Sequence, residues 1–191
     1  CRSERTDNQL PVYRFKLFEM KETSEEIFPL VDPDGRVTGT APRSLCHDGK
    51  SMLLHPVVHL HLFNPSGELF LQKRSYSKDI QPGKWDTSVG GHISPEESVE
   101  EALYREAREE IGLHSFTPQP AGKYVWESDR ERELVYSFTC VSEVEPVIDM
   151  NEAVDGRFWK ITEIEENMGK GVFTSNFEYE YKLLKTKLRP D

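Results

Sequence analysis

Three glutamates in the middle of the chain have a spacing that suits metal binding. Glu106, Glu109 and Glu110 stand at positions i, i+3 and i+4, so their side chains converge if the segment is a helix. Carboxylates gathered on a buried helix face are costly unless a cation neutralises them. Oxygen-only ligands favour Mg²⁺ or Mn²⁺ over Zn²⁺. The spacing therefore predicts a divalent-metal site.

The segment that carries these acids is predicted to be a helix. Ser94 is a suitable N-cap, Pro95 suits the first helical position, and Glu97 completes a capping box three residues after the cap. Gly112 is the predicted C-terminal end of the helix.

One face of this predicted helix changes from apolar to acidic. Val99, Ala102 and Leu103 share the face that leads, one turn later, to the three glutamates. An acidic helix face is usually solvated. Here the acids continue the apolar side and follow the turn Gly90-Gly91, where backbone can approach a ligand closely. This arrangement favours a site over a solvated surface.

The same residues resemble the Nudix box. Gly91 is followed after five residues by Glu97, and after seven more by Arg-Glu-Ala-Arg-Glu-Glu-Ile-Gly-Leu at residues 105–113. Every fixed position of that motif is filled. The resemblance implies an α/β fold, an α/β/α sandwich around a mixed sheet. It also implies Mg²⁺-dependent cleavage of a nucleoside diphosphate linked to another group, with Mn²⁺ as an alternative metal.

The resemblance also assigns roles within the box. It implies that the metal is held by Glu106, Glu109 and Glu110, optionally with the backbone carbonyl of Gly91. It further implies an ion pair between Glu97 and Arg105 that braces the loop against the helix.

Residues 27–140 resemble one branch of this family, type I isopentenyl-diphosphate isomerase. The matching segments include Leu54-His55, residues 88–92 and Glu131-Arg132-Glu133. In that isomerase three histidines and two glutamates hold a divalent metal. The matching positions here are His47, His55, His92, Glu131 and Glu133. The interval from His47 to His55 is one residue longer than in the family. His59 and His61 have no family match, so a structural or surface role is expected for them.

The chain departs from that branch at Gly90, the position of the isomerase's catalytic cysteine. Without a thiol there, proton transfer lacks its acid–base partner. The box is also intact here, whereas it is degenerate in the isomerase. The prediction is therefore an isomerase-like Nudix hydrolase. Two alternatives stay open: an isomerase of isoprenoid diphosphates, and a non-catalytic Nudix protein that binds a metabolite.

The predicted reaction is attack of a metal-activated water on a diphosphate. The predicted catalytic residues are Glu109, Glu110, Glu133 and Glu152, of which the last three are alternative bases for that water. Substrate contacts are predicted for the cations Lys73, Arg74 and Lys78. They are also predicted for the aromatic residues Trp85, Tyr124 and Trp126, which could stack on a base or line an isoprenoid pocket.

The composition limits the classes of partner. The 191 residues carry a net charge of −10, from 24 basic and 34 acidic residues, so a broad nucleic-acid-binding surface is not expected. No apolar run approaches the roughly 20 residues of a membrane span. The three cysteines lack a metal-like spacing, so a cytoplasmic location is predicted. The predicted partner is a small-molecule diphosphate, and a homodimer is plausible from the family resemblance.

The rest of the pattern predicts the elements that hold these residues. Residues 1–19 are predicted to be an N-terminal extension, and residues 20–191 a single domain with a C-terminal helix. Strands are predicted at residues 27–31, 36–39, 57–63, 68–73, 123–127, 133–141 and 157–160, with a loop at residues 75–86. A capping box at Thr162 predicts a short helix. A last helix begins near Ser175 and buries Phe177, Tyr181, Leu184 and Leu188.

Overall fold

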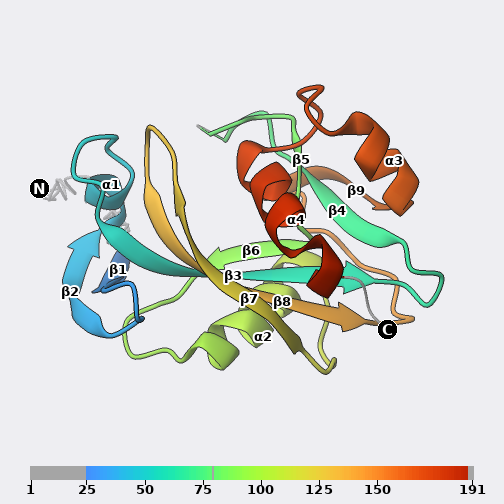
Figure 1. The fold of residues 1–191 in the computed structure, drawn as a ribbon. Helices are drawn as coiled ribbons and strands as arrows, with labels where there is room; N and C mark the ends of the chain where they lie inside the picture. Colours follow the sequence, from blue (N-terminus) through green and yellow to red (C-terminus); the bar gives the residue numbers. More distant parts are fainter. Residues whose placement is uncertain (1–24, 79, 189–191) are drawn as a thin grey trace, which may run out of the picture.

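The computed structural model describes residues 25–78 and 80–188 (Figure 1). The predicted N-terminal extension, residues 1–19, lies outside this described part. The elements along the chain are β1 (Ile27–Val31), β2 (Val37–Pro42), α1 (Arg43–Cys46), β3 (Leu54–Phe63), β4 (Leu69–Arg74), β5 (Trp85–Asp86), β6 (Val89–His92), α2 (Val99–Ile111), β7 (Gln119–Glu127), β8 (Arg132–Val141), β9 (Ala153–Trp159), α3 (Ile161–Asn167) and α4 (Ser175–Leu188).

Seven strands form a mixed sheet around β3. The order is β5-β4-β3-β8-β7, with β6 paired to β3 and β9 paired to β4. β3 and β8 are parallel, and the other pairs are antiparallel. Every residue of β3 is buried, because it has neighbours along both edges and helices cover both faces. β1 and β2 form a separate two-stranded sheet.

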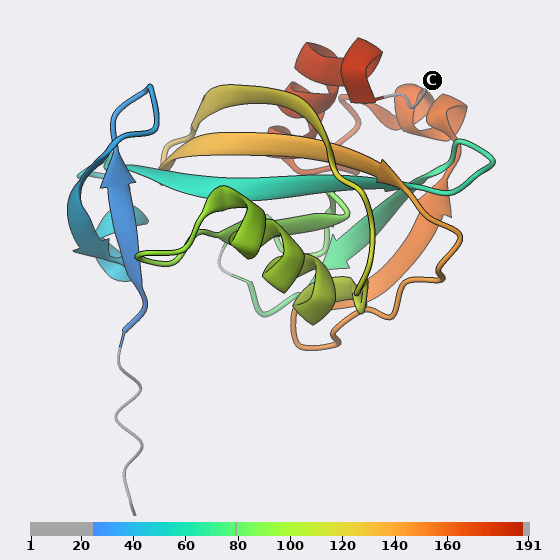
Figure 2. The same cartoon turned by 90° about the horizontal axis from the view of Figure 1, so that it is seen from below.

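Helices cover the two faces of the mixed sheet, as the α/β/α prediction requires (Figure 2). On one face α2 buries Leu103 and Ile111 against Leu60 of β3. On the other face α4 buries the predicted residues Phe177, Tyr181 and Leu184 against the sheet, while the side chain of Leu188 is outside the described part of the structure. Alternate side chains of β3 therefore pack into two separate hydrophobic clusters, one on each face of the sheet. No described helix is long and apolar enough to cross a membrane.

The predicted hairpin of β3 and β4 opens immediately after its turn. Only Phe63 and Leu69 are paired between these strands. Ser88 lies in the gap beyond them, where its Oγ donates to the Phe70 carbonyl at 2.6 Å and accepts from the Leu62 amide at 2.8 Å. The gap lets β6 enter beside β3. The splayed strands thus form the floor on which the site is built.

Helix α2 begins four residues later than predicted. Its N-cap is Ser98, not Ser94, and Glu101 completes the capping box. Glu96 has a φ of 65°, a left-handed conformation that interrupts the helix between the two serines. The predicted end is confirmed, since Gly112 caps the helix with a φ of 65°.

Other boundaries also differ from the predictions. β3 begins at Leu54 rather than at residue 57, and β7 begins at Gln119 rather than at residue 123. β9 begins at Ala153 rather than at residue 157, because it continues along β4 as far as Arg74. α3 begins at Ile161 rather than after Thr162, and its first turn is closed by Glu163, which accepts from the Lys160 amide at 3.1 Å.

Candidate active site

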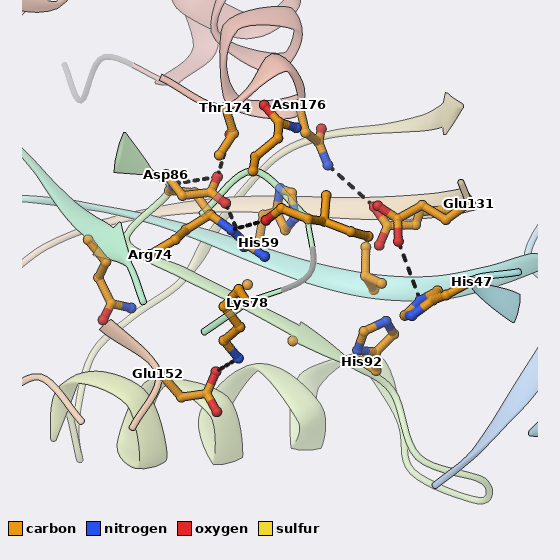
Figure 3. A pocket seen from close by; sticks show the side chains of 18 of the residues that line it. His47, His59, Arg74, Lys78, Asp86, His92, Glu131, Glu152, Thr174 and Asn176 are labelled. Carbon is orange, nitrogen blue, oxygen red and sulfur yellow. Dashed lines mark hydrogen bonds and ion pairs between the residues drawn. The ribbon is translucent and has the colours of Figure 1, made fainter. Parts of the chain in front are cut away.

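A pocket of about 960 Å³ opens between the splayed strands, the side of α2 and the first residues of α4 (Figure 3). It is lined by residues from both predicted constellations. The predicted site residues among the lining are His47, Arg74, Lys78, Gly91, His92, Glu106, Glu109, Glu110, Trp126, Glu131, Glu133 and Glu152. The fold therefore gathers segments more than 100 residues apart into a single cavity.

The acids of α2 meet β6 at Gly91. A Cβ atom at position 91 would lie 2.0 Å from the Glu106 carboxyl carbon, so only glycine allows the carboxylate to lie directly on this strand. Glu110 is partly buried and accepts from Gln72 Nε2 at 2.8 Å, whereas the Glu109 side chain is 54% exposed. The three acids therefore differ in exposure: Glu106 lies against the strand, Glu110 is partly buried, and Glu109 is largely exposed.

Burial makes these carboxylates poor anions on their own. It raises the pKa of Glu110 to about 8, and the neighbouring Glu106 carboxylate adds to the shift. Burial also raises the pKa of Glu106. A divalent cation would remove both causes, because it supplies the missing positive charge. The donor set, oxygen only, fits Mg²⁺ or Mn²⁺.

Arg105 braces the loop before α2 against the helix. Its guanidinium donates to both carboxylate oxygens of Glu97, at 2.7 Å and 2.9 Å, and to the His92 carbonyl at 3.0 Å. It also contacts Glu106 at 2.6 Å and Glu109 at 3.3 Å. The ion pair expected from the resemblance is present, and it joins two box acids to the end of β6.

The histidines and glutamates of the second constellation converge at the other end of the pocket. One ligand atom from each of His47, His55, His92 and Glu133 lies within 4.8 Å of the others. The Nε2 atoms of His47 and His55 are 3.3 Å apart, and Glu131 Oε2 is 3.4 Å from His47 Nε2. The longer interval before His55 does not separate the two residues, because their ring centroids are 5.2 Å apart.

Packing fixes the orientation of these rings. His55 Nδ1 is 3.0 Å from the Leu53 carbonyl, which leaves Nε2 directed at the cluster. The ring of Phe28, from β1, stacks on His92 with centroids 4.1 Å apart. The small sheet of β1 and β2 therefore supports the histidines from outside the main sheet.

The protonation states also suit a metal. Burial lowers the pKa of His47 to about 4, helped by the charge of Arg43, so the ring is neutral near neutral pH. Burial likewise raises the pKa of Glu133 to about 8, with a further contribution from Glu131. The Nε2 atom of His92 is buried with no hydrogen-bond partner among the described residues. A cation would complete this set.

The predicted substrate contacts divide into two groups. Arg74, Lys78 and Trp126 line the pocket, where Arg74 pairs with Asp86 at 3.0 Å and Lys78 pairs with Glu152. Lys73, Trp85 and Tyr124 are not among the described residues that line it. Trp85 packs edge-on against Trp159, and the Tyr124 hydroxyl donates to Asn176 at 3.0 Å.

Several pocket residues were not predicted from the sequence. Gln72, Asp86, Thr174 and Asn176 all line the cavity. Gln72 had a usable signal, because it is a polar residue directly after the apolar run Leu69-Phe70-Leu71 of a strand. The residues at the start of α4 had none, since their place opposite β8 depends on how the helix crosses the sheet.

Comparison of the chain with known proteins identifies a matching family. A model described as the NUDIX domain matches residues 53–177. An isopentenyl-diphosphate Delta-isomerase of Clavibacter michiganensis is 36% identical over 88 residues, 46% of this chain and 45% of that protein. The chain thus spans about half the length of the curated isomerases it matches.

Two further relatives cover more of the chain. An uncharacterized Nudix hydrolase of Pseudomonas aeruginosa is 29% identical over 133 residues, 70% of this chain and 78% of that protein. The crystal structure of DR0079 from Deinococcus radiodurans has a TM-score of 0.70 at 24% identity, covering 86% of this chain and 100% of that one. The likeness to DR0079 shows a shared fold.

The contact between Gly91 and Glu106 gives a matched pair of substitutions. Gly91→Ala places a Cβ within 2.3 Å of three Glu106 atoms, so the carboxylate must move. We expect Mn²⁺ affinity to fall about 10- to 100-fold, as for other changes that misplace a ligand. Gly90→Ala is the control, because its nearest contact would be 3.4 Å and it should change affinity less than about twofold. Electron paramagnetic resonance of free Mn²⁺ measures both. Equal affinities would contradict the role of the glycine.

Proposed function

The chain belongs to the Nudix family, and on that premise we propose that it is a divalent-metal-dependent hydrolase that cleaves a diphosphate linkage in a small molecule. The observation that carries this proposal is the complete box, folded so that Glu106, Glu109 and Glu110 face a single deep pocket. The named hydrolase among its relatives supports it.

The charge of the pocket supports a role for metal. The described residues that line it include ten Asp and Glu but only four Lys and Arg. A diphosphate is itself strongly anionic, so such a lining would repel it without added cations. We assign Mg²⁺, or Mn²⁺, to the three box glutamates and the Gly91 carbonyl. When bound there, the cation neutralises the diphosphate oxygens and lowers the pKa of a coordinated water.

The chain's own residues then orient the substrate and accept a proton. Gln72 holds the Glu110 carboxylate in place through its 2.8 Å hydrogen bond. Arg74 and Lys78 are placed to bind phosphate oxygens, although each is paired with an acid in this structure. The water proton is accepted by one of three carboxylates that line the pocket, Glu110, Glu133 or Glu152.

We also propose a second metal, held by His47, His55, His92, Glu131 and Glu133. Neutral imidazoles with buried carboxylates suit Zn²⁺, Mn²⁺ or Mg²⁺. A cation here would offset the acids on the β8 side of the pocket and hold the far end of the substrate.

This cluster favours a second candidate function, isomerisation of an isoprenoid diphosphate, because the named isomerases are among the relatives. Gly90 argues against isomerisation, because it occupies the position of the isomerase's catalytic cysteine and has no thiol. The described cysteines, Cys46 and Cys140, are buried and do not line the pocket. Burial raises the pKa of both thiols, which disfavours the reactive thiolate.

The hydrolase proposal is tested by product release from a panel of nucleoside and isoprenoid diphosphates, with and without Mg²⁺. We expect Mg²⁺-dependent turnover of one class. Glu109→Gln and Glu110→Gln should each reduce kcat about 100-fold or more, since each removes a metal-binding charge. Glu100→Gln, an exposed acid on the same helix, is the control and should retain activity.

The same panel separates the alternatives. Conversion of isopentenyl diphosphate to its double-bond isomer without phosphate release would support the isomerase. Absence of turnover, with metal-dependent binding retained, would support a metabolite-binding protein instead.

The second metal gives a separate prediction. After removal of metals, Mn²⁺ titration of the wild type should show two classes of site. His55→Gln should abolish one class, because it removes a buried ligand and its fixed orientation. Glu110→Gln should weaken the other. His114→Gln, at an exposed histidine, is the control. One class of site in the wild type would contradict the two-metal arrangement.

A further inference from the structure

Two histidines that match no motif meet a buried acid beneath the pocket. His59 and His61 point from β3 toward α4, where the Glu180 carboxylate lies between them with no exposed surface. His59 Nδ1 is 2.7 Å from Glu180 Oε2, and His61 Nε2 is 3.1 Å from Glu180 Oε1. A charged residue on the buried face of α4, three residues after Phe177, needs such a partner.

The two histidines differ in what they can reach. His61 is fully buried and is not among the described residues that line the pocket, whereas His59 lines it. Figure 3 shows His59 near the middle of the pocket, with Arg74 to one side, His47 and His92 to the other, and Lys78 below it. The surface or structural role expected for His59 is therefore incomplete, because part of its ring faces the cavity.

Gly90 leaves the far edge of the His59 ring open. The two residues are paired across β3 and β6, and a Cβ at position 90 would lie 3.6 Å from His59 Nε2. With Nδ1 bonded to Glu180, Nε2 is the remaining polar atom of the ring, and no described residue is hydrogen-bonded to it. The missing side chain at position 90 thus exposes one nitrogen to the pocket.

The surroundings of the ring favour its charged form. Burial alone lowers the pKa of His59, but the carboxylates around the ring together outweigh burial and raise the pKa to about 9, with Glu180 contributing the largest increase. Glu133 of β8 and Asp86 of β5 act in the same direction. In the imidazolium both nitrogens carry a proton, so Nε2 is a donor held in a fixed direction.

We propose that His59 is a substrate-binding residue whose Nε2 donates a hydrogen bond to a phosphate oxygen of the diphosphate, and that Glu180 is the residue that positions it. This inference rests on the proposed function. The metals would hold the diphosphate from the two acidic ends of the pocket. His59 lies between those ends, where a phosphate oxygen not held by metal needs a donor.

Calorimetric titration with imidodiphosphate, a diphosphate that resists cleavage, tests the role of His59 in saturating Mg²⁺. His59→Gln should weaken binding about 10- to 100-fold, the loss expected for a hydrogen bond to a charged group. His61→Gln is the matched control, because it touches the same carboxylate but does not line the pocket. It should bind within about threefold of the wild type.

Two readouts separate binding from folding. Thermal unfolding reports whether each variant is folded, and Mn²⁺ titration should be unchanged in both. Glu180→Gln adds a pH test: its loss of affinity relative to the wild type should be larger at about pH 8 than at about pH 6. The neutral amide no longer raises the pKa of His59, so the fraction of protonated ring in this variant is smaller at the higher pH. A purely structural role would give equal losses at both pH values.

The outcomes are distinct from those of the hydrolase test. Wild-type affinity in folded His59→Gln would overturn the inference, as would an equal loss in His61→Gln or absence of imidodiphosphate binding by the wild type. Binding that depends on His59 in a protein without turnover would support this inference while contradicting the proposed hydrolysis.

Discussion

The geometry of the site depends on the contacts of Arg105. One guanidinium binds Glu97 before the helix, the His92 carbonyl at the end of β6, and Glu106 within the helix. These contacts hold α2 against the strand at a separation that only Gly91 permits. Arg105 also compensates part of the negative charge that converges there. The loop, the helix and the strand are therefore positioned by a single charged group, and the remaining carboxylates face the pocket.

The lining of the pocket carries more negative than positive charge. Its acids come from α2, β5, β8 and the segments before β1, β8 and β9, and its described lysines and arginines are fewer. Arg74 is paired with Asp86, and Lys78 with Glu152, so neither is a free cation in this structure. The lowered pKa of His47 keeps that ring neutral, whereas the raised pKa of His59, beside Glu180, keeps this ring charged. A polyanionic substrate fits such a cavity when metals bind with it.

The motif residues could be predicted because their signal is local. Helical spacing alone brings Glu106 and Glu110 together, and strand alternation places Glu131 and Glu133 on one side. Boundaries were less predictable, because Ser94 and Ser98 both offer a capping pattern and only the backbone at Glu96 separates them. Contacts between distant elements could not be predicted from the sequence. The opening between β3 and β4, and the crossing of α4 that brings Glu180 to His59, arise from packing between distant segments.

The central claim is that the box acids bind a divalent cation in this pocket. The most direct measurement is an anomalous difference map from a crystal of the protein with Mn²⁺, collected at the manganese absorption edge. The account predicts a peak between Glu106, Glu109 and Glu110, next to the Gly91 carbonyl, and a second among His47, His55 and His92. A map with no peak at the three glutamates, in protein that is folded and saturated with Mn²⁺, would contradict it.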